Sequence, residues 1–488
     1  MGCSASRRIH PDEPLSAMRK YAPLEPDATM SKLFQGRRGS MMLTPEAYNE
    51  ASTLWDLMRP LPSGLPPVKL IRSDWLESQA ARLREATTDE ERARLALPHR
   101  QILENMAPEA FIGPEEIEKL PLGIEKRSMP IPLPILCVSH CWATAQHPDP
   151  LGHTVVALAD AIKREQSVAV STGRTDAPSY KLMPPTMAIF LDWCSLCQKD
   201  VASGERTPEE KEAFHVALSS MQAWYAHAKT TTFLMTAATP GSEGTPPYAE
   251  RGWPTFESQV SMIAKSNQAS YWPMVVDVGS ESGSCHRPAP PMKAEFAQLL
   301  STKTFSNGKS DCEMVTELYW QTVEALMETQ RSFSFNQMGW TDADLRQFCR
   351  WLPHCRELTR IRLNENPQFT DAGLAELAAT LRDPTVAPKL KRLTCRFDGT
   401  EYLMLSTPEG TEELREVCKA RHIEFNPISR RRSSAATTIQ VRYRYHRISS
   451  ESGRNTSSKL TMSSASLSSF GMDEATTTSR PIEEKSSC

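Results

Sequence analysis

The sequence has no long uninterrupted hydrophobic stretch. Its most apolar run, Met129–Val138, is broken by Pro130, Pro132 and Pro134. It is also far shorter than the ~20 residues that a membrane-spanning helix requires. We therefore expect no transmembrane helix in this chain of 488 residues. An excess of one charge is also lacking: 56 basic and 59 acidic residues leave a net charge of −3, which argues against a nucleic-acid-binding protein.

The twelve cysteines have no regular spacing and no signal peptide precedes them, so we expect reduced thiols in a cytosolic compartment. Cys194 and Cys197 form a single C-x-x-C pair. A structural zinc site needs four ligands, and no second pair lies at a suitable spacing. We predict that this pair packs at the end of a strand, with zinc as the alternative, and we assign no metal site.

The N-terminus carries a lipidation pattern. Removal of the initiator methionine would expose Gly2, and Ser6 completes the N-myristoylation pattern. Cys3 is positioned for palmitoylation, and Arg7 and Arg8 follow. One myristoyl chain binds membranes only marginally, whereas a second chain or nearby basic residues make attachment durable. Unless this start is a chance match, it predicts binding to membrane lipid through acyl chains, on the cytoplasmic face of the plasma membrane.

Composition divides the chain into six segments. Pro- and Arg-containing sequence comes first, helix-forming residues follow, and Ser- and Thr-rich sequence that cannot bury a core ends the chain. We expect a flexible acylated tether (1–44), a helical region (45–128), an α/β domain (129–330), a repeat segment (331–426), a basic helix (427–450) and a disordered tail (451–488).

In the middle of the chain, short apolar runs alternate with longer amphipathic stretches, which indicates an α/β domain with a parallel sheet. The expected strands are Ile135–Val138, Ala188–Leu191, Thr231–Met235 and Met274–Val278, and the expected helices are Leu151–Ile162, Pro208–Ala228 and Pro291–Leu300. Ligands of such sheets bind beyond the carboxyl ends of the strands. Ser139, His140, Trp142 and Asp192 would lie there, and Ser139, Trp142 and Asp192 are our candidate ligand-binding residues.

Four short motifs in this region occur in a recognisable order. They are Ser139 and Trp142 after a strand, Asp192, Ser195 and Gln198 after the next, Met221, Tyr225 and Ala228 at a helix end, and Arg251, Trp253 and Glu257. This order resembles the heterokaryon-incompatibility (HET) domain of fungi, a relative of the Toll/interleukin-receptor (TIR) domain. Cys194 stands one residue from the family cysteine, and Phe256 replaces a frequent glutamine.

The resemblance implies two alternative roles for Glu257. In NAD-cleaving TIR domains the glutamate of W-x-x-x-E is catalytic, and Trp253 and Glu257 have that spacing, which puts both on one helix face. A carboxylate there would stabilise oxocarbenium-like charge as nicotinamide leaves. Trp253 and Arg251 are then further catalytic candidates, with NAD as substrate and no bound cofactor. Alternatively, Glu257 pairs with Arg251 to cap the helix, and Trp253 fills the core.

A repeat follows the α/β domain. Phe335-Asn336 recurs 28 residues later as Leu363-Asn364, and each copy precedes a Thr-Asp pair and a helix, Leu345–Leu352 or Leu374–Leu381. The segment Leu358–Asn366 fits the leucine-rich repeat pattern, and a degenerate third unit opens at Leu390. Three units are about the minimum that stack stably, so we expect this short α/β array to rest on the preceding domain. Unrelated helices with chance leucines are the alternative.

The basic segment near the C-terminus resembles an incomplete calmodulin-binding IQ motif. Ile439, Gln440 and Arg444 match it, whereas Tyr445 replaces the following glycine. Binding of calmodulin, binding to a membrane surface and a solvated linker all remain open. Together these features favour a membrane-tethered intracellular signalling adaptor that assembles with protein partners; the alternative is an NAD-cleaving enzyme that uses Glu257.

Overall fold

A computed structural model describes most of the chain between Leu43 and Asn426. The described residues are 43–120, 132–144, 146–171, 184–200, 203–237, 245–265, 274–279, 287–305, 309–336, 338–395 and 411–426. They form a mixed α/β protein with one six-stranded and one four-stranded sheet, which confirms the predicted α/β class. The lipidation residues Gly2 and Cys3 and the basic-helix residues Ile439, Gln440 and Arg444 lie outside these ranges.

The larger sheet has the strand order β2-β1-β4-β3-β5-β6. Its strands are β1 (Leu70–Arg72), β2 (Phe111–Ile112), β3 (Ile135–Ser139), β4 (Ala188–Phe190), β5 (Thr231–Leu234) and β6 (Val275–Asp277). The four strands β3 to β6 run parallel to one another, as their continuous apolar runs predict for strands buried on both faces. All four lie within one residue of the predicted bounds, so this part of the prediction is confirmed.

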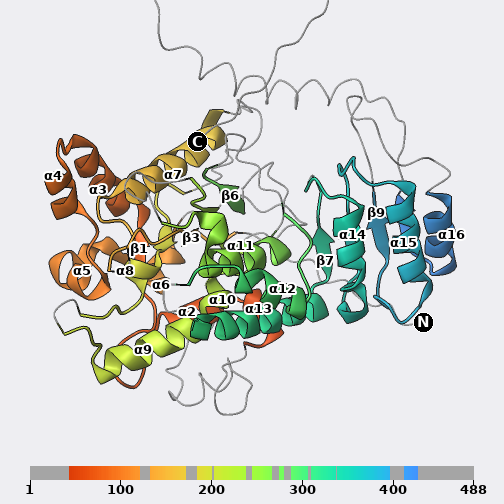
Figure 1. Ribbon diagram of the computed structural model, residues 1–488, viewed down its shortest axis with the longest axis horizontal. Coiled ribbons are helices and arrows are strands. Elements are labelled where there is room, and N and C mark those ends of the chain that lie inside the picture. The colour runs from red at the N-terminus through yellow and green to blue at the C-terminus, as the bar shows by residue number, and fades with distance from the viewer. Residues whose placement is uncertain are drawn as a thin grey trace, which may run out of the picture. The chain divides into compact units, whose positions relative to one another are not determined.

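Helices cover both faces of this sheet (Figure 1). On one face lie α3 (Ser73–Glu85) and α7 (His153–Ser171). On the other face lie α10 (Met221–Tyr225) and α11 (Gly252–Ala264). Behind them, α13 (Lys309–Thr329) packs against α11, and α12 (Lys293–Ser301) packs against α13. The pleat of β3 divides its side chains between the two cores: Leu136 and Val138 join the core under α7, whereas Ile135 and Cys137 face α10 and α11. Ser139, in phase with Cys137, therefore faces α11.

The prediction that residues 45–128 are helical is incomplete. The segment contains α2 (Ala51–Leu57), α4 (Asp89–Leu95), α5 (Arg100–Met106), α6 (Pro114–Ile117), η2 (Pro45–Tyr48) and η3 (Pro108–Ala110). It also supplies β1 and β2, which extend the sheet with antiparallel pairing. Strands of two or three residues are too short to produce an alternating pattern in the sequence. The sheet therefore begins well before the predicted boundary at residue 129.

The predicted helix Pro208–Ala228 is two helices. They are α9 (Pro208–Ser219) and α10, which begins at Met221; α8 (Asp192–Ser195) and η4 (Tyr248–Glu250) are short additional turns. Ser220 separates α9 from α10, and its hydroxyl donates to the Val216 and Ala217 carbonyls at the end of α9. A serine that bonds back to the preceding turn competes with continuation of the helix.

The second sheet is entirely parallel, with the order β10-β9-β8-β7. Its strands are β7 (Ser332–Ser334), β8 (Arg360–Arg362), β9 (Arg392–Thr394) and β10 (Glu424–Asn426); α14 (Asp342–Cys349), η5 (Leu352–His354), α15 (Asp371–Arg382) and α16 (Glu412–Ala420) accompany them. Helices α14 and α15 begin earlier than predicted, because Thr341 and Thr370 occupy their N-cap positions.

The four-stranded sheet rests on the preceding residues through buried tryptophans. Trp340 Nε1 donates to the Arg287 carbonyl at 2.5 Å, and Trp351 Nε1 donates to the Pro290 carbonyl at 2.7 Å. One apolar core continues from Phe256 under the larger sheet to Leu393 in the smaller one. Within the described residues, no helix is long and apolar enough to cross a membrane.

Candidate functional site

A buried polar cluster lies at the carboxyl end of β3, where the strand order and the topology of parallel sheets predict a ligand site. Ser139 is the last residue of β3, and Glu257 lies on the face of α11 that packs against the sheet. Ser139 Oγ donates to Glu257 Oε2 at 2.6 Å. Both residues are buried, with 0 % of Ser139 and 6 % of Glu257 exposed. The structure thus joins two predicted site residues that are 118 positions apart.

Two tyrosines close this cluster. The hydroxyl of Tyr248, from η4, shares a hydrogen bond of 2.6 Å with Ser139 Oγ and lies 3.4 Å from the Pro254 carbonyl. Tyr225, from α10, donates to the Val138 carbonyl at 2.9 Å and also hydrogen-bonds Glu257. The carboxyl group is therefore surrounded by hydroxyl groups and apolar side chains.

This environment favours the protonated form of Glu257. Burial, helped by the nearby charge of Asp192, raises the pKa of Glu257 to about 8, although the Ser139 and Tyr225 hydrogen bonds and His140 act to lower it. At neutral pH the side chain is thus mainly an uncharged carboxylic acid, which can both donate and accept a hydrogen bond.

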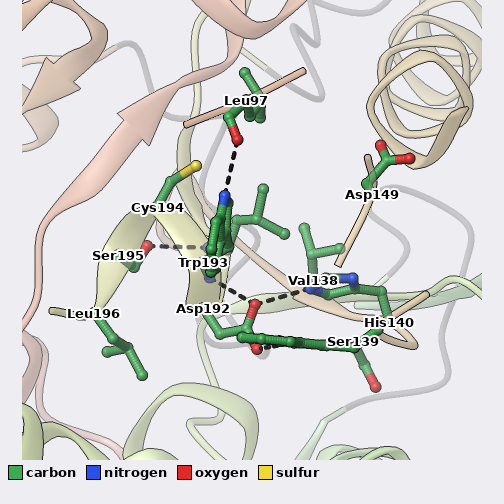
Figure 2. Close-up of polar contacts among 12 residues, drawn as sticks. Leu97, Val138, Ser139, His140, Asp149, Asp192, Trp193, Cys194, Ser195 and Leu196 are labelled. Atoms are coloured by element: carbon green, nitrogen blue, oxygen red, sulfur yellow. Dashed lines mark hydrogen bonds and ion pairs between the residues drawn. The ribbon is translucent and has the colours of Figure 1, made fainter. Parts of the chain in front are cut away.

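A second set of contacts centres on Asp192, at the carboxyl end of β4 (Figure 2). Its carboxylate accepts from His140 Nε2 at 2.9 Å, from Trp142 Nε1 at 2.9 Å and from the Trp193 backbone amide at 2.6 Å. Burial raises the pKa of Asp192, but the imidazole of His140 and these hydrogen bonds outweigh burial and lower it overall. Asp192 is therefore ionised, in contrast to Glu257.

His140 connects the two sets of contacts. It bonds Asp192 and directly follows Ser139, which bonds Glu257. Burial lowers the pKa of His140, but Asp192, Glu257 and Asp149 together raise it overall. The Nε2 atom is used by Asp192, whereas the buried Nδ1 has no hydrogen-bond partner in the described part of the protein. Of the two carboxyl groups, Glu257 is thus uncharged and Asp192 is ionised. Enzymes use such pairs in acid–base chemistry, and buried structural networks also produce them.

The predicted ion pair between Arg251 and Glu257 does not form. Arg251 instead donates from Nε to the Pro246 carbonyl at 3.0 Å and from one terminal nitrogen to the Trp142 carbonyl at 3.1 Å. Among the described residues, no carboxylate pairs with this guanidinium. The Arg251 side chain therefore connects the loop after β3 to the start of α11 through its hydrogen bond to the Trp142 carbonyl.

The structure also separates Trp253 from Glu257. Trp253 Nε1 donates to Asp311 Oδ2 on α13 at 3.0 Å, and its ring packs edge-on against Phe256. The Glu257 side chain instead points toward β3, where it bonds Ser139. Residues four apart are neighbours on one face of a helix. Here that face lies between the sheet and α13, so the Trp253 side chain contacts α13 and the Glu257 side chain contacts β3.

The C-x-x-C pair lies in apolar surroundings. Cys194 is fully buried in the core under α7, and Cys197 is buried in the core on the other face of the sheet. Burial raises the pKa of both thiols, so the reactive and metal-binding thiolate is disfavoured. In the part of the chain that the structure describes, no group of three or more His, Cys, Asp and Glu residues could hold a metal ion.

Sequence reasoning missed Tyr248 and Asp149. Tyr248 lies in a single short turn, and nothing in the sequence around it has a period that would indicate burial. Asp149 accepts from the Val155 amide at 3.0 Å and so caps the start of α7. An aspartate after proline and before a helical run is a cap signal, so this residue could have been found.

No protein-family model matches the chain, and no curated protein matches it either. The cluster at the carboxyl ends of β3 and β4 holds an uncharged acid and a charged acid, and its hydrogen bonds are made mainly within the cluster.

Proposed function

We propose that the protein is a membrane-tethered intracellular signalling adaptor, which assembles with protein partners through a TIR/HET-like domain and through a repeat surface. The observation that carries this proposal is the position of Glu257, which is buried and hydrogen-bonded to Ser139 in surroundings that favour its uncharged form. The hydrogen bond between Glu257 and Ser139 holds α11 against β3, which is a structural role.

Cleavage of NAD would require a different state of this residue. A group that stabilises oxocarbenium-like charge must be ionised and must reach the ribose. Glu257 has a pKa of about 8 and is 6 % exposed, so it meets neither condition in this structure. One observation favours the enzymatic alternative: the cluster lies beyond the carboxyl ends of parallel strands, where ligands of such sheets bind.

The repeat interpretation is supported by how the described residues of 332–395 and 411–426 stack. Each of the first two units runs from a strand to a threonine-capped helix, and neighbouring strands pair in parallel. Asn366, which matches the asparagine of the repeat pattern, has 0 % exposure and bonds to backbone groups of both its own unit and the preceding one.

Two further parts of the proposal rest on the sequence alone. We propose that acyl chains on Gly2 and Cys3 hold the protein on the cytoplasmic face of the plasma membrane. Ile439, Gln440 and Arg444 would bind calmodulin or a related light chain through a basic helix.

The decisive test is incubation of the purified full chain with NAD at high concentration, with release of nicotinamide followed by chromatography. We expect no release above that of the Glu257→Gln variant. Glu250→Gln is the matched control, because Glu250 is exposed and lies seven residues earlier. Nicotinamide release that falls roughly a hundred- to thousandfold in Glu257→Gln but not in Glu250→Gln would overturn the adaptor proposal in favour of the enzyme.

A further inference from the structure

The open face of the four-stranded sheet carries a cluster of arginines. In β7, β8 and β9 the central residue is buried and the two flanking residues point away from the core. The strand register aligns these outward residues in two rows. One row is Ser332, Arg360, Arg392 and Glu424; the other begins with Ser334, Arg362 and Thr394.

The charges of this face are not balanced. Arg392 forms an ion pair with Glu424 at 2.5 Å. Arg360 and Arg362 have neither an ion pair nor a side-chain hydrogen bond in the part of the chain that the structure describes, although each is partly buried. Burial and the positive charges of Arg360 and Arg392 lower the pKa of Arg362. Several other arginines in this segment form ion pairs, for example Arg346 with Glu376 at 2.8 Å.

A polar atom beside these arginines also lacks a partner. Thr394, next to Arg362 in the second row, has a buried Oγ1 with no hydrogen-bond partner in the described residues. Buried hydroxyl groups are normally hydrogen-bonded, so an unpaired one next to an unpaired guanidinium indicates an incomplete set of contacts. A bound anionic group that also accepts or donates hydrogen bonds would complete it.

We propose that this face, defined by Arg360, Arg362, Arg392 and Thr394, is a docking surface for an extended acidic peptide segment of a protein partner. Arg360 and Arg362 lie on one face of one strand, about 6.6 Å apart along it. An extended peptide repeats its side chains on one face with the same period, so carboxylates at alternate positions match the two guanidinium groups. Arg392, about 4.8 Å away on the next strand, adds positive charge on one side.

The inference rests on the proposed adaptor function, because it names the chemistry of one partner. It can nevertheless fail separately, since neither the NAD assay nor membrane attachment involves this face. An anionic membrane is the competing source of negative charge. The partly buried position of Arg360 and Arg362 favours a narrow peptide over a flat lipid surface.

The test uses the full chain and a fluorescein-labelled peptide in which glutamate alternates with threonine, followed by fluorescence anisotropy. We expect saturable binding that weakens with rising salt and disappears when glutamine replaces glutamate. The double variant Arg360→Gln/Arg362→Gln should lose roughly tenfold in affinity per arginine. Arg362→Lys should lose less, because it keeps the charge but not the two-pronged geometry.

The matched control is Arg356→Gln/Arg415→Gln, which removes two exposed arginines of the same segment that lie off this face. It should bind like the wild type. The melting temperature of Arg360→Gln/Arg362→Gln should stay unchanged or rise, because like charges are removed. No binding of the alternating peptide, an equal loss in the control, or full displacement by phosphatidylserine vesicles would overturn the inference.

Discussion

At the scale of single residues, the charge state of Glu257 is set by where its carboxyl group lies. A glutamate in water has a pKa near its ordinary value, but burial of Glu257 raises its pKa to about 8, although the Ser139 and Tyr225 hydrogen bonds act to lower it. Asp192 lies in the same cluster and stays ionised, because His140 and Trp142 donate to both of its oxygens. The same chemical group therefore has two charge states in one cluster, and the charge of His140 beside Asp192, together with its hydrogen bonds, makes the difference.

This charge state predicts how stability depends on pH. The folded protein holds the Glu257 proton between the unfolded value of 4.5 and about 8, whereas the unfolded chain releases it. The contribution of Glu257 is therefore fully present below pH 4.5 and is lost as the pH rises through about 8, at about 1.4 kcal/mol per pH unit. In Glu257→Gln this loss is absent, so the variant should gain stability relative to the wild type as pH rises. Urea unfolding between pH 5 and pH 8 measures the difference.

Glu250→Gln provides the control for this experiment, because Glu250 is exposed. The buried Lys265, with a pKa lowered to about 7 by burial, also titrates in this range but is common to all variants. Parallel pH profiles for the wild type and Glu257→Gln would show that the carboxyl group is ionised in the folded protein. Below about pH 4.5 the two should differ little, because glutamine resembles a protonated glutamate and no Arg251 ion pair is lost.

At the scale of elements, Asn366 joins two strand–helix units. Its Oδ1 accepts from the amides of Met338 and Trp340 at 3.0 and 3.1 Å, and its Nδ2 donates to the carbonyls of Phe335 and Leu363 at 2.8 and 2.9 Å. Asn366→Ala would leave these four buried backbone groups without their partner. Each buried hydrogen bond contributes about 1 kcal/mol, so we expect a loss of about 3 kcal/mol or more, measured by urea unfolding.

Asn336→Ala is the comparison for this prediction. Asn336 accepts from the Asn364 amide at 2.8 Å and donates to Ser334 Oγ at 3.3 Å, so it bridges the same two strands with fewer backbone bonds. We expect a loss of about 1 kcal/mol. If Asn366→Ala were no more destabilising than Asn336→Ala, the stacking of these units would not depend on the asparagine.

At the scale of the whole molecule, membrane attachment should depend on the first three residues. A single myristoyl chain supports only marginal binding, and Arg7 and Arg8 add about 1 kcal/mol each near anionic lipid. Gly2→Ala, which removes the acceptor of the first chain, should move the protein to the soluble fraction. Cys3→Ser should leave a partly membrane-bound population. Cell fractionation measures both, and unchanged membrane association of Gly2→Ala would contradict the proposed tether.

The sequence by itself determined the strands of the parallel sheet and the position of the polar cluster. Ile135–Val138 and the three runs that follow it are continuously apolar, and only a sheet covered on both faces buries such runs. Since parallel strands gather their carboxyl ends at one edge, Ser139 and Asp192 had to lie near one another. The threonine caps of α14 and α15 are local as well, because a cap depends on its own turn.

Only the tertiary structure decided which partners these residues have. The strands β1 and β2 are too short to leave a pattern, and they form because an edge of the sheet is available to pair with. Glu257 meets Ser139 rather than Arg251 because α11 packs with that face against β3. Gly252 allows a different long-range contact, of the start of α11 with Phe305, since a β-carbon there would lie 2.0 Å from the Phe305 ring. Such contacts join residues far apart in the chain, and spacing along the sequence carries no information about them.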